Sequence, residues 1–156
     1  MMERILGVLG GIAVIAAPIG VAAQKPVTAW TAHMTGTAET PANQSKGSGT
    51  ATFTLKGTML TYTVTARGMS GPAVAGHIHV GPVGVAGPPV FTFTIEPNTV
   101  KGGTVAKGTL DLGKQLPNGV TGDSLRVLLL NGQAYVNVHT TLLPKGEIRG
   151  QLMARK

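Results

Sequence analysis

Three histidines stand at positions from which they could bind one ligand together. His77 and His79 are two residues apart in the segment V-A-G-H-I-H-V-G-P. Side chains two apart on a β-strand point to one face of the sheet, so both imidazoles emerge on the same side. His139 shares a face with Tyr135 and Asn137 in a second β-type segment, Y-V-N-V-H-T. Two histidines at this spacing and a third from another strand form a ligand set that suits zinc or copper.

The segment after His139 adds charged groups to this polar face. In G-E-I-R-G-Q-L, each polar residue is followed by an apolar residue or by glycine. A hairpin loop at residues 141–145 would set His139 opposite Glu147 and Asn137 opposite Arg149. In that register Glu147 is a candidate oxygen ligand, or a partner that fixes the tautomer of His139.

The same polar face has two further interpretations. One is a structural network of polar side chains, Glu39, Asn137, Glu147 and Arg149. In it Arg149 holds one of the two carboxylates in a charge-assisted pair, and no ligand is needed. The other is a binding surface for an unknown partner. His33 is expected on an outer face near the first strand and is not counted as a ligand.

Short β-strands are the elements that would position these residues. Threonines alternate with apolar residues in T-A-T-F-T-L and in L-T-Y-T-V-T, and the turn K-G-T joins the two runs. This alternation is typical of half-buried antiparallel strands. Besides the strand of His77 and His79, we predict strands at Val27–Thr35, Thr50–Leu55, Met59–Ala66, Val90–Ile95, Val105–Leu112, Leu125–Leu130, Ala134–Thr140 and Glu147–Leu152. No stretch after the start of the chain shows a sustained helical period, and about eight or nine strands indicate a sandwich or small barrel. We predict that the strand of His77 and His79 lies beside or near the strand of His139, so that three of the four histidines gather in one place.

The Gly- and Pro-rich segment Gly81–Pro89 follows His79. Its apolar residues Val83, Val85 and Ala86 could cover the histidines as a lid or dock a partner. Because segments of this composition usually just cross between sheets, we expect such a crossing here.

The first 23 residues read as a secretory signal peptide. A short start with one arginine, Met1–Arg4, precedes the apolar run Ile5–Ala17, and Val21–Ala23 supplies small residues for cleavage. The apolar run is too short for a typical membrane-spanning helix. We therefore expect residues 24–156 to form one exported domain with a single core, periplasmic or secreted, and no membrane span after removal of the signal.

Composition excludes several classes of function. The formal net charge of +7 is spread along the chain without a basic block, which argues against nucleic-acid binding and leaves an acidic surface as a partner. The chain has no cysteine, so neither disulfides nor cysteine-based catalysis is available. It also lacks a nucleophile elbow, a phosphate loop and a dinucleotide fingerprint. Metal-dependent redox chemistry is the one enzymatic role left, and we expect a binding module rather than an enzyme.

Four segments together resemble the CHRD domain, a module repeated in the animal growth-factor antagonist chordin and found alone in exported bacterial proteins. They are W-T-A-H-M-T-G-T-A-E-T-P at Trp30–Pro41, H-I-H-V-G-P at His77–Pro82, Y-V-N-V-H-T at Tyr135–Thr140 and G-E-I-R-G-Q-L at Gly146–Leu152. The resemblance implies an all-β fold, an antiparallel immunoglobulin-like or superoxide-dismutase-like β-sandwich, and no settled activity. Similar His-x-His strands carry copper in copper/zinc superoxide dismutases, but the cysteine pair of those enzymes has no counterpart here.

These observations favour an exported binding or structural module of the CHRD type. Its partner would be an extracellular or periplasmic protein, or an acidic surface. The alternative is a copper- or zinc-binding protein that uses His77, His79 and His139, with dismutase-like redox activity.

Overall fold

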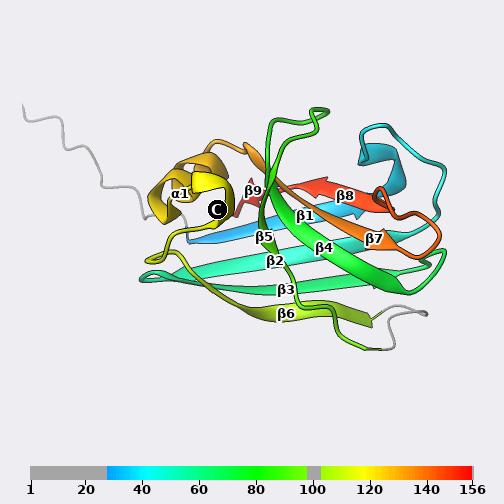
Figure 1. Cartoon of the computed structure of the whole chain (residues 1–156), viewed down its shortest axis with the longest axis horizontal. Coiled ribbons are helices and arrows are strands. Elements are labelled where there is room, and N and C mark those ends of the chain that lie inside the picture. The colour runs from blue at the N-terminus through cyan, green and yellow to red at the C-terminus, as the bar shows by residue number, and fades with distance from the viewer. Residues whose placement is uncertain (1–27, 98–102, 156) are drawn as a thin grey trace, which may run out of the picture.

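A computed structural model describes residues 28–97 and 103–155 of the chain (Figure 1). The expected signal peptide at residues 1–23 lies outside the described residues. The strands within them are β1 (Ala29–Thr35), β2 (Ser48–Lys56), β3 (Met59–Arg67), β4 (Ala73–Val80), β5 (Pro89–Thr92), β6 (Gly103–Asp111), β7 (Ala134–Thr140), β8 (Ile148–Gln151) and β9 (Met153–Ala154). They are joined by one α-helix, α1 (Gly122–Leu130), and by short 3-10 turns at Gly36–Ala38 and Pro117–Gly119.

All nine of these strands belong to one antiparallel sheet that is strongly curled. Its order is β5-β4-β7-β8-β1-β2-β3-β6, and β9 pairs with β1. Figure 1 shows β4, β5 and β7 crossing over β1, β2 and β3. The curl brings the two ends of the sheet together. The ring centroids of Phe91 in β5 and Tyr62 in β3 are 5.6 Å apart, and the backbone N–H of Glu96, after β5, donates to Val105 O in β6. The core fills the space between the two halves.

The expected alternation in the second and third strands is confirmed. Phe53 pairs with Tyr62 and both rings are buried, whereas the neighbouring pair Thr52 and Thr63 points the other way. The turn between these strands joins Lys56 to Met59, as the sequence predicted. Burial of each large apolar side chain contributes roughly 1.5–3 kcal/mol, so this face holds the strands in register.

The sandwich expected from the sequence differs from the structure in one respect. The strands are antiparallel and enclose a single core, but hydrogen bonds connect them into one sheet rather than two. The two halves are connected through β1, which pairs with β8 at Thr35 and Arg149 and with β9 at two further positions. The result is a half-barrel.

The strand predicted at Leu125–Leu130 is wrong, because these residues belong to α1. The side chain of Thr121 caps the helix by accepting a hydrogen bond from the backbone N–H of Ser124, 3.1 Å away. Leu125 and Leu129, four residues apart, are buried, while Val127 is exposed. This spacing is helical, and the short apolar run concealed it. Trp30 Nε1 donates to Leu129 O at 3.1 Å, which ties α1 to β1.

Among the described residues, no helix has both the length and the apolar character needed to cross a membrane.

Candidate metal centre

Pairing between β4 and β7 brings three histidines from two strands into one cluster. His77 lies opposite Asn137, His79 opposite Tyr135, and Ala75 opposite His139. The predicted proximity of the two histidine-bearing strands is therefore confirmed. His33 lies elsewhere, on β1 opposite Thr50 of β2, and its side chain is exposed.

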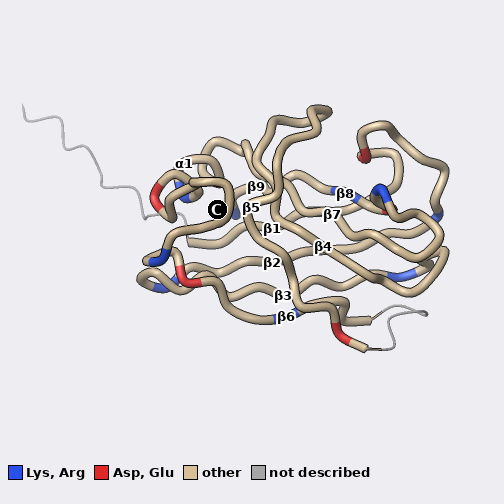
Figure 2. Tube along the Cα trace, in the orientation of Figure 1, with Lys and Arg blue, Asp and Glu red and all other residues tan. Residues whose placement is uncertain are grey.

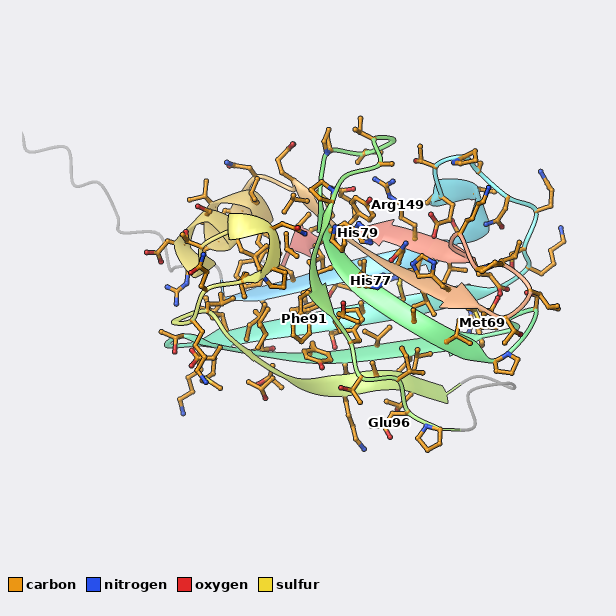
Figure 3. All side chains as sticks on the ribbon, in the orientation of Figure 1. Met69, His77, His79, Phe91, Glu96 and Arg149 are labelled. Carbon is orange, nitrogen blue, oxygen red and sulfur yellow. The ribbon has the colours of Figure 1, made fainter. Side chains whose placement is uncertain are left out.

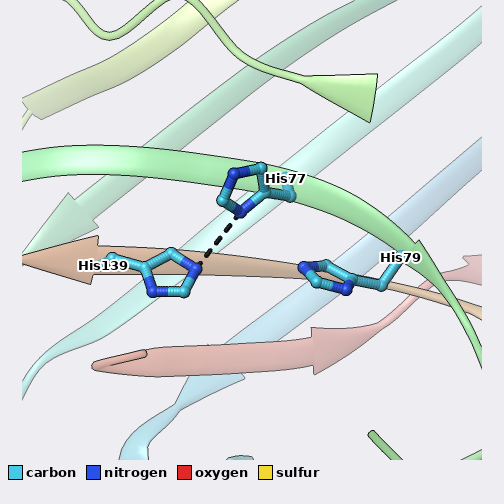
Figure 4. Close-up of side chains that lie close together, drawn as sticks. All are labelled: His77, His79 and His139. Carbon is cyan, nitrogen blue, oxygen red and sulfur yellow. Dashed lines mark hydrogen bonds between the residues drawn. The ribbon is translucent and has the colours of Figure 1, made fainter. Parts of the chain in front are cut away.

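The three imidazoles converge on a small volume (Figure 4). One nitrogen of each ring lies within 4.8 Å of a nitrogen of each of the others. His77 Nδ1 and His139 Nε2 are 3.2 Å apart, and their rings stand at an interplanar angle of 77°. All three side chains are half-buried. The described residues contain no other group of this kind.

Backbone carbonyls define the tautomers of two of the rings. His79 Nδ1 lies 2.8 Å from Gly87 O, and His139 Nδ1 lies 3.0 Å from Pro144 O. A carbonyl oxygen only accepts hydrogen bonds, so each Nδ1 carries the proton and each Nε2 carries a lone pair. The lone pair of His139 Nε2 faces His77 Nδ1. His79 Nε2 is buried and has no hydrogen-bond partner. Metal-binding histidines are commonly held in this way by a second hydrogen bond.

His79 is also held from the side by an aromatic and cationic stack. The Tyr135 ring lies against it, with centroids 4.8 Å apart and planes 9° apart. On the other face of that ring, Arg149 Cζ is 3.5 Å from the centroid. Figure 3 shows His77, His79 and Arg149 gathered on the same side of the sheet, while Glu96 lies beside β6.

The expected crossing between sheets is wrong, because the segment from Gly81 to Pro89 connects β4 to β5, which are neighbours in one sheet. The segment also supplies the contacts to this stack. Arg149 donates to Val85 O at 2.8 Å and to Pro82 O at 3.2 Å. The backbone N–H of Gly87 donates to the Tyr135 hydroxyl at 3.0 Å. The side chain of Val83 is 76% exposed, so the backbone of this segment, rather than an apolar lid, contacts the site. A Cβ at position 87 would lie 1.7 Å from Val80 O, which is why glycine stands there.

Burial favours the neutral imidazole in this cluster. It lowers the pKa of His77, and the charges of His139 and His79 lower it further. Burial likewise lowers the pKa of His79, against the hydrogen bond to Gly87 O, which raises it. Since an unperturbed histidine titrates near pH 6.5, both rings are neutral at pH 7. Neutral imidazole is the form that binds metal ions.

The structure does not bring Glu147 into this cluster. Its carboxylate, which is fully buried, accepts hydrogen bonds from Ser45 Oγ at 2.6 Å, Thr140 Oγ1 at 2.5 Å, and the backbone N–H and hydroxyl of Ser70, both at 2.7 Å. Burial raises its pKa, but these hydrogen bonds outweigh burial and the pKa is lowered. Thr140 and His139 are adjacent in β7 and point to opposite faces, so Glu147 lies on the far side from the imidazole.

The remaining members of the expected network are arranged differently from the prediction. Asn137 does pair with Arg149, as the hairpin register predicted. Arg149 donates to Thr40 Oγ1 at 3.1 Å and to the carbonyls named above, rather than forming an ion pair with a carboxylate. Within the described residues, an ion pair does form between Lys107 and Glu96, away from the histidines. Burial raises the pKa of Glu39 to about 6, and its Oε1 has no hydrogen-bond partner.

Sequence reasoning missed the carbonyl groups of Gly87 and Pro144 and the stacking of Tyr135 on His79. Every residue has a backbone carbonyl, so the residue types at positions 87 and 144 do not reveal that their carbonyls contact a histidine. Tyr135 was placed on the correct face, and its pairing with His79 could have been found by extending the β4–β7 register.

A curled antiparallel sheet that carries three converging imidazoles on neighbouring strands defines a β-domain with a candidate metal centre. Residues 30–152 match the CHRD domain family, and the chain therefore belongs to that family. The resemblance seen in the sequence is confirmed. The chain has no match among curated proteins or among solved structures.

Proposed function

We propose that this CHRD domain binds one zinc or copper ion through His77 Nδ1, His79 Nε2 and His139 Nε2. The supporting observation is the buried, unpartnered Nε2 of His79 beside the closely spaced nitrogens of the other two rings. Two imidazole nitrogens on a tetrahedral ion, with bonds of about 2.0–2.1 Å, are roughly 3.3 Å apart. The separation of 3.2 Å between His77 Nδ1 and His139 Nε2 fits that geometry.

A purely structural role accounts for these residues less completely. It explains the contact between His77 and His139, in which one ring donates to the other. It leaves the buried His79 Nε2 without a partner, although buried polar atoms are rarely unpaired. An ion would satisfy this nitrogen and would join all three rings.

The nature of the ligands limits the chemistry of the bound ion. Imidazole suits both zinc and copper, and three protein ligands leave a coordination position for water or another small ligand. With copper, the centre would also support dismutase-like redox chemistry. Superoxide consumption by the copper-loaded protein that equals that of the same amount of free copper would contradict this activity.

We also propose that the domain is exported to the periplasm or secreted, and that it acts there as a binding module. The support is the signal-like pattern of residues 1–23 together with the net charge of +7. Figure 2 shows the basic residues distributed over several elements, so an acidic partner would be attracted by the whole domain rather than by one patch. Fractionation of cells that express the full chain tests the location.

Metal binding is tested on protein purified without a histidine tag. Elemental analysis should find about one ion per chain after loading, and calorimetric titration with Zn²⁺ and Cu²⁺ should release or absorb heat. An ion present at a hundred times its dissociation constant should stabilise the fold by about 2.7 kcal/mol. His79→Ala and His139→Ala should lose both effects. His33→Ala is the matched control, because His33 is exposed and lies outside the cluster. No heat and no shift in melting temperature with the unaltered protein would end the proposal.

A further inference from the structure

A second unsatisfied atom lies beside the histidines. Four buried side-chain atoms of the described residues lack a hydrogen-bond partner: Glu39 Oε1, His79 Nε2, Arg126 Nε and Asn137 Oδ1. Two of the four belong to residues of the histidine face. The Asn137 side chain is only 5% exposed, so water does not readily replace the missing partner.

Asn137 occupies the middle of the histidine face. It is paired with His77 across the two strands, and it follows Tyr135, the partner of His79, by two residues. His139 follows it by two residues on the same face of β7.

The ligand set explains why an acceptor oxygen at this point matters. The cluster consists of histidines alone, without a carboxylate. A divalent ion held by neutral ligands keeps its full positive charge, so small anions are attracted to its remaining position. A hydrogen-bond acceptor beside that position repels ligands that present only lone pairs. It favours ligands that can donate a hydrogen bond.

We propose that Asn137 Oδ1 faces the fourth coordination position of the bound ion and accepts a hydrogen bond from water or hydroxide there. The centre therefore selects fourth ligands that carry a proton, such as hydroxide or hydroperoxide, over bare anions such as azide or chloride. This inference rests on the proposed metal binding. It assigns Asn137 as a positioning and specificity-determining residue.

The test measures azide binding to the copper-loaded protein by visible absorption. The unaltered protein should bind azide weakly. Asn137→Leu, which keeps the size but removes the oxygen, should bind azide about tenfold more tightly or better. Asn137→Asp should bind it more weakly than the unaltered protein, because the added charge repels the anion. His33→Ala should match the unaltered protein. Equal azide affinity in the unaltered, Leu and Asp proteins would overturn the inference.

A measurement on the unaltered protein keeps the inference testable if the variants fail to fold. Pulsed electron paramagnetic resonance of the copper-loaded protein in D₂O should detect exchangeable deuterons of a coordinated water or hydroxide. Absence of that signal would overturn the role of Asn137. Failure of the unaltered protein to bind copper or zinc at all is a different result, because it removes the metal site itself.

Discussion

The ring of Tyr135 lies flat against the imidazole of His79, at 4.8 Å between centroids. The stack links the histidine to Arg149, which covers the other face of the tyrosine. The imidazole is thus held by a ring on one side and by the carbonyl of Gly87 at its Nδ1. Its orientation is set without an ion, which would reduce the cost of ordering this side chain if it binds a metal as proposed.

Removal of the stack should weaken metal binding while the fold survives. We expect Tyr135→Leu to lower the affinity for Zn²⁺ by about tenfold or more, the range seen when groups that orient metal ligands are lost. Tyr135→Phe should lose less affinity for Zn²⁺, because it keeps the stacked ring and removes only the hydroxyl that contacts Gly87. Competition against a chelator of known affinity measures both. Equal affinity in the Leu and unaltered proteins would show that stacking does not position His79.

The carboxylate of Glu147 should support stability rather than metal binding. Glu147→Ala removes a buried carboxylate that accepts from Ser45, Ser70 and Thr140 and leaves the buried Thr140 hydroxyl without this partner, so we expect a loss of about 3 kcal/mol or more in the free energy of unfolding. Urea denaturation measures this loss. At a temperature where the variant is folded, its zinc affinity should be unchanged, and a large loss of affinity would place Glu147 in the metal centre.

Acid should act on Glu147 in the usual direction for a carboxylate. Its pKa is lowered in the folded protein, so its contribution to stability is present at neutral pH and is lost as the pH falls below about 4.5 and through the folded-state pKa. The stability difference between the unaltered protein and Glu147→Ala should therefore shrink in acid. A difference that stays constant down to pH 3 would contradict this assignment.

Glu39 should show the opposite dependence. Burial raises its pKa to about 6, from a model-peptide value of 4.5. The folded state then resists ionisation, so this group destabilises the fold as the pH rises from about 4.5 through 6, and the penalty is complete above that range. Because the side chain is partly exposed, we expect Glu39→Gln to stabilise the protein at pH 7.5 by at most about 1 kcal/mol. At pH 4 the two proteins should be equal in urea denaturation, and a gain that persists there would have another cause.

Because residues 122–130 form a helix, substitutions at Leu129 and Val127 should have different effects on stability, whereas in a strand they should have similar effects. Leu129 is fully buried and Val127 is 56% exposed, although side chains two apart on a strand would share a face. Leu129→Ala should cost about 2–5 kcal/mol through the cavity it leaves, and Val127→Ala about 0.5 kcal/mol or less. Thermal or urea unfolding compares the two. Similar losses would mean that both residues are buried.

Most strands were predictable because their signal is local. Alternating threonine and apolar residues in T-A-T-F-T-L determine which face is buried, whatever the partner strand. The segment R-V-L-L-L was ambiguous, because a short apolar run is compatible with either a strand or a helix. The cap at Thr121 and the acidic residue Asp123 in the first turn were the available signals for a helix.

The members of the histidine cluster were predictable from the sequence, but their surroundings were not. The spacing of His77 and His79 and the register that pairs Asn137 with Arg149 follow from strand geometry alone. The direction of the Glu147 carboxylate does not, because Gly146 before it has a φ of 128° and the regular alternation starts only at Ile148.

The sequence by itself determined that the chain is built of antiparallel strands, that it belongs to the CHRD family, and that His77 and His79 share one face. These properties depend on periodicity and on short motifs, which are local features of the sequence. Only the tertiary structure decided that the two halves form one curled sheet, since that depends on the pairing of β1 with β8 and β9. The tautomer of His79 was likewise decided by Gly87 O, a backbone atom brought close by the fold. Such contacts complete the surroundings of the histidines. They cannot be predicted from the pattern of side chains, because they involve backbone groups that are far apart in the sequence.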